Sequence, residues 1–308
     1  MRRTVLVAVV LALVATVVLT TRRTAPVGHF TSLEGHDRFD VAYRAAMTRM
    51  PVPDATLDVR TDHGVVRMYR FDGPPGTPLV LIPGRASASP VWADNVPSLR
   101  ALRTVYAMDL LGEPGRSVQS RPIVDDADQA AWLDQALAAL PTPTVHVLGL
   151  SIGGWTAANL AVRRPERLAS LTLIEPAQTF APIPLGTVVR SVPASVRWLP
   201  RSWRDAFGSY TANGAPVEHE PVADMIEAGM QTYALALPQP TLLEPRLPVP
   251  TLVILAGRSV MHDSAAAAEN ARRLNPTARV LTYPDASHAI SGEHPERIAG
   301  DVAAVLTT

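Results

Sequence analysis

The chain has 308 residues, which is enough for one large α/β domain with an insertion. It carries 28 basic and 28 acidic residues, so the formal net charge is zero and no nucleic-acid partner is expected. The absence of cysteine excludes a disulfide framework and a thiolate zinc site.

Residues 1–24 read as a targeting segment separate from the rest of the chain. An uncharged run rich in Val, Leu and Ala covers residues 4–21, with a pair of arginines on each side. At about 1.5 Å per residue, a helix of this length only just crosses the hydrocarbon core of a bilayer. We expect an uncleaved single-pass anchor in the cytoplasmic membrane, with the catalytic domain outside the cytoplasm. A cleaved export signal, and hence a secreted protein, is the alternative.

Residues 25–54 are predicted to form a linker and one short helix, from about Asp40 to Met50. The strands that follow include short, fully apolar runs, as expected of strands buried on both faces. They are predicted at Ala55–Thr61, Val65–Phe71, Leu79–Ile82, Val105–Met108, Val145–Leu150 and Leu171–Ile174, with helices at about 126–139 and 152–163. This alternation predicts an α/β fold with a mostly parallel central sheet flanked by helices.

The alternation stops between residues 177 and 248. This segment is rich in proline and too long for a simple loop, so it is predicted to be an inserted helical lid, with helices at Pro193–Phe207 and Pro221–Leu235. Trp198, Trp203 and Met225 are among its apolar residues, which we expect to pack inward. Alternation then resumes with predicted elements at 251–256, 265–274, 279–283 and 295–306, so that the main domain covers residues 55–308.

The motif G-x-S-x-G at residues 149–153 follows an apolar strand and precedes an alanine-rich helix. In this context it predicts a nucleophile elbow, a sharp turn that exposes the hydroxyl of Ser151 above the sheet. Glycines at 149 and 153 leave room where the strand and helix backbones approach closely. Ser151 is therefore the candidate nucleophile.

Five stretches together resemble the α/β-hydrolase superfamily, and more closely its bacterial carboxylesterase-like branch. They are Pro78–Arg85, Asp109–Gly115, Gly149–Gly153, Glu175–Phe180 and Pro284–Ala289. The resemblance implies that His288, in the loop after the last strand, is the base for Ser151. It also implies an oxyanion hole formed by the backbone amides of Ile152 and Arg85, although Pro83 stands where the family usually has histidine. His262 and His294 remain minor alternatives for the base.

The acidic member of the triad is left open by the sequence. Its usual position, after the strand at 251–256, carries Ser259 or Val260. Glu175 ends the strand before the lid, where some members of the superfamily place the acid, and we expect it to complete the triad. Asp263 is the alternative acid, although it would also suit a helix N-cap.

These residues predict a serine hydrolase that cleaves a carboxylic ester or related acyl bond of a small molecule, through an acyl-enzyme on Ser151. No metal or organic cofactor is implied. The alternative is a catalytically vestigial, membrane-tethered binding protein that has kept the fold and the pocket. The lack of a carboxylate at the usual position of the acid motivates this alternative. Substrate identity and oligomeric state do not follow from the sequence.

Overall fold

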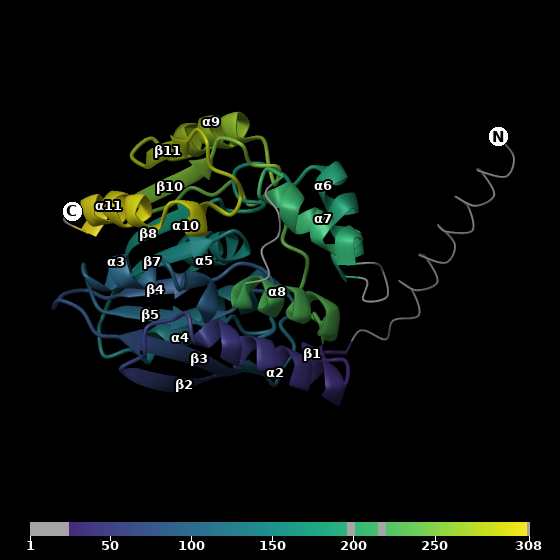
Figure 1. The fold of residues 1–308 in the computed structure, drawn as a ribbon. Coiled ribbons are helices and arrows are strands. Elements are labelled where there is room, and N and C mark those ends of the chain that lie inside the picture. Colours follow the sequence, from purple (N-terminus) through teal and green to yellow (C-terminus); the bar gives the residue numbers. More distant parts are fainter. Residues whose placement is uncertain (1–24, 196–200, 215–219, 307–308) are drawn as a thin grey trace, which may run out of the picture.

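The computed structural model describes residues 25–195, 201–214 and 220–306. Its centre is a nine-stranded sheet in the order β11-β10-β8-β7-β4-β5-β3-β2, with β6 paired to β3 (Figure 1). The strands are β2 (Ala55–Thr61), β3 (Gly64–Phe71), β4 (Leu79–Ile82), β5 (Val105–Met108), β6 (Val118–Gln119), β7 (Val145–Leu150), β8 (Leu168–Ile174), β10 (Thr251–Ala256) and β11 (Arg279–Tyr283). The pairs from β5 to β11 are parallel, and β3 pairs antiparallel with β2 and β5. The predicted mostly parallel sheet is confirmed.

Helices cover both faces of the sheet (Figure 1). One apolar cluster joins the sheet to α4 (Asp126–Ala138), α5 (Ile152–Arg163) and α9 (Ser264–Leu274). A second cluster joins the opposite face to α2 (Leu33–Met47), α3 (Val96–Arg100), α8 (Pro221–Thr232) and α11 (Pro295–Leu306). Side chains of β4 alternate between the two: Val80 lies in the first cluster, and Leu79 in the second. This double burial explains why β4 is apolar throughout.

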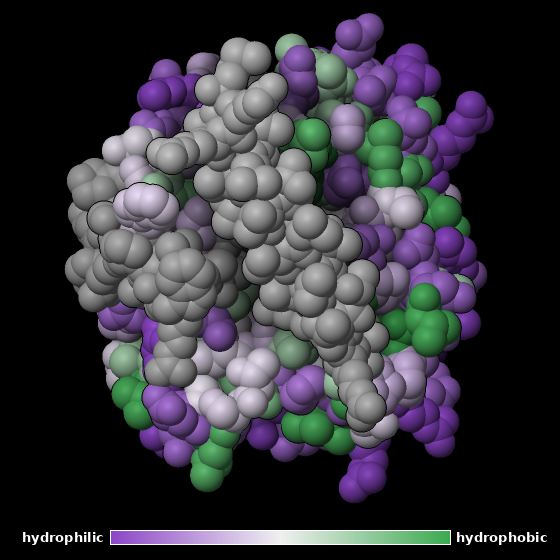
Figure 2. Space-filling model, turned by 90° about the vertical axis from the view of Figure 1, so that its right-hand side faces the viewer, coloured by the Kyte–Doolittle hydropathy of each residue, from purple (hydrophilic) through white to green (hydrophobic). Residues whose placement is uncertain are grey.

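The lid segment lies between β8 and β10. It contains α6 (Leu185–Ser191), the 3-10 helix η3 (Val192–Ser195), α7 (Arg201–Thr211), α8 and the short strand β9 (Tyr233–Ala234). Met225 is fully buried as expected, but Trp203 is 61% exposed, so the expectation that it packs inward is wrong. Figure 2 shows this side of the molecule, where hydrophobic and hydrophilic residues are interspersed. Trp198 lies outside the described residues.

Several predicted boundaries are wrong for local reasons. α2 begins at Leu33 rather than near Asp40, because the Ser32 hydroxyl caps it by accepting a hydrogen bond from Gly35 N at 3.0 Å. α8 ends at Thr232 instead of Leu235, because Tyr233 enters β9, which pairs with β1 (His29–Phe30). Of the helix expected at 193–207, the first residues lie in the 3-10 helix η3, which ends at Ser195, and the last lie in α7, which continues to Thr211; residues 196–200 are outside the described part.

The apolar run at 4–21 falls outside the described residues, so the predicted anchor has no structural counterpart to compare. Within the described part of the chain, no helix combines the length and apolar character needed to cross a bilayer.

A buried polar network ties α2 to the body of the domain. Asp109, which follows β5, accepts hydrogen bonds from Ser89 N and Oγ, Arg116 N and the Tyr43 hydroxyl, all between 2.6 and 2.8 Å. Tyr43 also shares a hydrogen bond of 2.8 Å with Tyr69. Burial, followed by the nearby Asp109 carboxylate, raises the pKa of Tyr43 far above its ordinary value, so its proton stays in place.

We expect Tyr43→Phe to lower the free energy of unfolding by about 2 kcal/mol, because the buried Asp109 carboxylate loses a hydrogen-bond donor. Urea unfolding followed by circular dichroism measures the loss. Tyr106→Phe is the matched control, since Tyr106 is also buried but its hydroxyl has no hydrogen-bond partner among the described residues. Equal effects of the two substitutions would contradict the role assigned to the network.

Candidate active site

Ser151 occupies the turn between β7 and α5 with φ 53° and ψ −116°, a left-handed conformation that is unfavourable for a residue with a side chain. The turn can form because its neighbours are glycines. A Cβ on Gly149 would lie 2.4 Å from the Gly153 carbonyl oxygen, and one on Gly153 would lie 2.3 Å from the Pro83 carbonyl oxygen. The geometry is that of the nucleophile elbow expected from the sequence.

His288 lies in the loop after β11 and faces Ser151. Its Nε2 is 3.0 Å from Ser151 Oγ. The loop is fixed on one side by Glu293, which accepts hydrogen bonds from Ser287 N and Oγ at 2.8 and 2.5 Å. On the other side, the His288 amide donates to the carbonyl of Thr211 in the lid helix α7 at 3.2 Å. The lid therefore helps to place the imidazole.

Glu175 is the carboxylate that the structure brings to His288. Its Oε2 lies 3.0 Å from His288 Nδ1. Glu175 itself has φ 47°, and its amide donates to Ile254 O across to β10 at 2.8 Å. When the carboxylate is ionised, Nδ1 must carry the proton, which leaves Nε2 free to accept the proton of the Ser151 hydroxyl.

The Glu175 carboxylate is fully buried and held from several directions. Ala256 N donates to Oε1 at 2.7 Å, and the Ser259 hydroxyl donates to Oε2 at 2.6 Å. Nε2 of the buried His262 lies 3.2 Å from Oε1, in an orientation that favours electrostatic contact over a linear hydrogen bond. Burial by itself raises the pKa of Glu175, but His262 and His288 outweigh it and hold the pKa well below its usual range. The group is thus a carboxylate at neutral pH.

Asp263, the alternative acid, lies elsewhere. Its Oδ1 accepts hydrogen bonds of 3.0 Å from Ala265 N and Ala266 N, so it caps the N-terminus of α9. Asp263 is therefore the helix N-cap, which the sequence also allowed, and it does not contact His288.

The two expected oxyanion donors lie beside Ser151. Ile152 is the first residue of α5, and an N–H in this position has no intrahelical acceptor. Gly84 approaches closely, since a Cβ there would lie 3.5 Å from Ser151 Cβ. The next amide, that of Arg85, donates to no acceptor among the described residues. The Arg85 side chain is 35% exposed and its Nε lies 3.7 Å from Oε1 of the buried Glu113.

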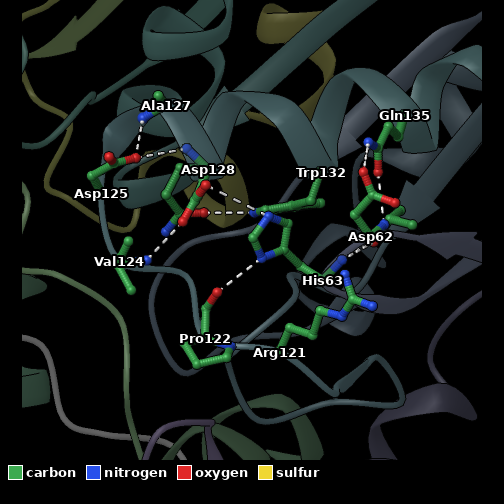
Figure 3. Close-up of polar contacts among 12 residues, drawn as sticks. Asp62, His63, Arg121, Pro122, Val124, Asp125, Ala127, Asp128, Trp132 and Gln135 are labelled. Atoms are coloured by element: carbon green, nitrogen blue, oxygen red, sulfur yellow. Dashed lines mark hydrogen bonds and ion pairs between the residues drawn. The ribbon is translucent and has the colours of Figure 1, made fainter.

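Histidines away from this centre have partners of their own. His63, in the turn between β2 and β3, contacts the Pro122 carbonyl and Asp128, beside the cap of α4 (Figure 3). His146 Nδ1 lies 2.7 Å from Ser170 Oγ, and His294 packs edge-on against Tyr283. His262, kept as a minor alternative for the base, contacts Glu175 rather than Ser151. Within the described ranges, no group of three or more His, Cys, Asp or Glu side chains could hold a metal ion.

Two residues at the site were not found from the sequence. The sequence indicates His262 only as an alternative base and not as a neighbour of the acid, and it assigns no role to Glu113. Glu113 follows β5, and its Oε2 accepts a hydrogen bond of 3.0 Å from Ala86 N in the oxyanion loop. A glutamate in an otherwise apolar and glycine-rich stretch at the end of a buried strand was the available signal.

Comparisons with known proteins identify the family. Residues 79–302 match the model of the alpha/beta hydrolase family. Carboxylesterase YbfK of Bacillus subtilis is 25% identical over 87% of this chain and 93% of its own length. A second carboxylesterase of the same organism, nap, is 24% identical over 84% of this chain and 88% of its own.

Among solved structures, the B. subtilis carboxylesterase CesB (YbfK) superposes with a TM-score of 0.81 at 24% identity, covering 89% of this chain and 99% of that one. This likeness establishes the fold, and the match to the family model covers well over half of the sequence. The chain belongs to the alpha/beta hydrolase family.

Proposed function

We propose that the protein is a serine hydrolase that cleaves a carboxylic ester through an acyl-enzyme on Ser151. The observation that carries this proposal is the continuous chain of contacts from Ser151 Oγ through His288 to Glu175, with both distances 3.0 Å. Beside Ser151 lie the backbone amides of Ile152 and Arg85, for which the described residues provide no acceptor. The carboxylesterase relatives support a hydrolase, and an ester as the bond that is broken.

The reaction follows from the positions of the protons. Ser151 Oγ attacks the carbonyl carbon while its proton passes to His288 Nε2, and Glu175 stabilises the imidazolium that forms. The negative oxygen of the tetrahedral intermediate accepts hydrogen bonds from the Ile152 and Arg85 amides. Collapse of the intermediate expels the alcohol, which takes the proton from His288. Water then gives a proton to His288, attacks the acyl-enzyme and releases the acid, and the proton returns to Ser151 Oγ.

The proposed substrate is a small acyl compound, because the space beside the oxyanion hole is narrow. Its lining combines apolar side chains, among them Ile152, Leu110, Leu111, Trp155 and Leu237, with the polar side chains of Arg85, Glu113, Gln129 and Thr156. A membrane anchor at residues 4–21, or export after cleavage there, remains a prediction from the sequence, as those residues are outside the described part.

Covalent labelling tests the proposal directly. We expect a fluorophosphonate to add one phosphonyl group to the full-length protein, on the peptide that contains Ser151, as found by mass spectrometry. A protein that reacts at no serine, or at a serine other than 151, would contradict the proposal. Lack of any reaction is the result expected of a vestigial binding protein.

A further inference from the structure

The loop that carries the second oxyanion donor is held in an unfavourable conformation. Ala86, directly after Arg85, has φ 53°, a region that residues with a Cβ seldom occupy. Such a backbone persists only where surrounding contacts determine it. Two contacts come from within the loop: Ser87 N and Oγ both donate to Gly84 O, at 3.4 and 2.9 Å. Neither of them fixes the peptide between Arg85 and Ala86.

Glu113, which follows β5, supplies the contact that fixes the peptide between Arg85 and Ala86. Its side chain is 1% exposed, and its Oε2 accepts the Ala86 N–H at 3.0 Å. The other oxygen, Oε1, is buried and has no hydrogen-bond partner in the described part of the chain, and Arg85 Nε is 3.7 Å away. Burial raises the pKa of Glu113, and the Arg85 cation and the Ala86 amide oppose this rise. A carboxyl group kept in so costly a position needs a compensating role.

The lid closes on the same loop from the other side. Gly229 of α8 lies so near that a Cβ there would be 3.2 Å from the Ala86 carbonyl oxygen and 2.8 Å from Pro114 Cγ. Ala86 is therefore enclosed between α8 and Glu113. The Ala86 amide, which belongs to the peptide between Arg85 and Ala86, is held by Glu113, while the Ala86 carbonyl, which belongs to the following peptide, lies against α8.

We propose that Glu113 is a positioning residue of the oxyanion hole: by accepting the Ala86 N–H, it fixes the loop so that the Arg85 N–H points at the tetrahedral oxygen. The Arg85 guanidinium supplies the counter-charge that keeps the carboxylate from opposing the oxyanion. This inference rests on the proposed function, since it needs Ser151 to form that intermediate. Glu113 acts on the reaction through the loop, although its side chain also lines the space proposed for the substrate.

The test compares variants that keep or remove the side-chain oxygen of residue 113 that accepts the Ala86 N–H. Glu113→Gln keeps an oxygen for Ala86 N, Glu113→Leu and Glu113→Met remove it, and Glu113→Asp withdraws it by one methylene group. Each full-length variant is assayed for kcat and KM on a short-chain p-nitrophenyl ester and for inhibition by a boronic acid, whose serine adduct imitates the tetrahedral intermediate.

We expect kcat of the Leu and Met variants to fall by about 10- to 100-fold with KM nearly unchanged, less than the roughly 10²- to 10³-fold loss of a whole oxyanion donor. Boronic acid affinity should fall by the same factor as kcat. The kcat of the Gln variant should stay within about threefold of wild type, and the kcat of the Asp variant should lie between those of the Gln and Leu variants. If the Leu and Met variants do not fold, the comparison of the Gln and Asp variants still tests the inference.

Asn275→Ala is the control for a general loss of stability. Asn275 is buried and holds the end of the lid segment through Pro245 O and Leu247 N, away from the oxyanion loop. Its kcat should match that of wild type at a temperature where both are folded. Unchanged kcat in the apolar variants, a change in KM alone, or a Gln variant as slow as the Leu variant would overturn the inference. In each of these cases, wild-type activity that depends on Ser151 would leave the proposed function intact.

Discussion

Ser151→Ala is expected to lower kcat for a short-chain p-nitrophenyl ester by about 10⁵-fold or more. Removal of Oγ leaves His288 with no hydroxyl to deprotonate, so no acyl-enzyme can form. The residual rate should reflect substrate binding and the oxyanion amides alone, because the Ile152 and Arg85 backbones are unchanged. Stopped-flow absorbance at saturating substrate measures the turnover, and a burst of p-nitrophenol in the wild type would report the acyl-enzyme itself.

A matched serine shows whether the loss is specific. Ser170 is also buried, and its hydroxyl lies 2.7 Å from His146 Nδ1, away from the triad. Ser170→Ala should therefore keep full kcat, with a small loss of stability as its only effect. If the Ser151 variant retained wild-type turnover, the nucleophile would be another group and the proposed mechanism would be wrong.

The parts of the fold that the sequence predicts well are those set by local pattern. Apolar runs such as Leu79–Ile82 mark buried strands whatever their neighbours are, and the motif at 149–153 places Ser151 in a turn. The start of α2 was missed because the cap at Ser32 lies in a stretch without a strong helical pattern. β1 and β9 were missed because two-residue strands exist only through their pairing with each other.

The site was harder to predict where it depends on contacts between distant segments. Glu175 and Asp263 both follow strands, and neither sequence position says which carboxylate faces His288. The register of β8 against β10 determines which carboxylate faces His288, because it brings Glu175 next to Ala256 N and Ser259. Glu113 and Ala86 are likewise joined only because β4 and β5 are neighbours in the sheet.

Two carboxamide substitutions distinguish the acids in solution. We expect Glu175→Gln to lower kcat by about 10⁴-fold, because an amide donor facing Nδ1 favours the tautomer whose Nε2 carries the proton and cannot accept one from Ser151. Asp263→Asn should leave kcat within about twofold of wild type. Asparagine caps helices about as well as aspartate, so the stability of α9 should also be kept.

The pH dependence sharpens this comparison. The depressed pKa of Glu175 keeps it ionised throughout an assay range of about pH 5 to 9, so protonation of this carboxylate should not limit the activity of the wild type within that range. In Glu175→Gln the imidazolium that forms during the reaction loses its buried counter-charge at every pH of the range, so the residual kcat should stay low throughout it. An Asp263→Asn variant that lost activity 10⁴-fold, or a Glu175→Gln variant with the wild-type rate and profile, would assign the acid to Asp263 against the geometry. A loss confined to Glu175→Gln, at every pH tested, identifies Glu175 as the group that orients His288 and stabilises its imidazolium.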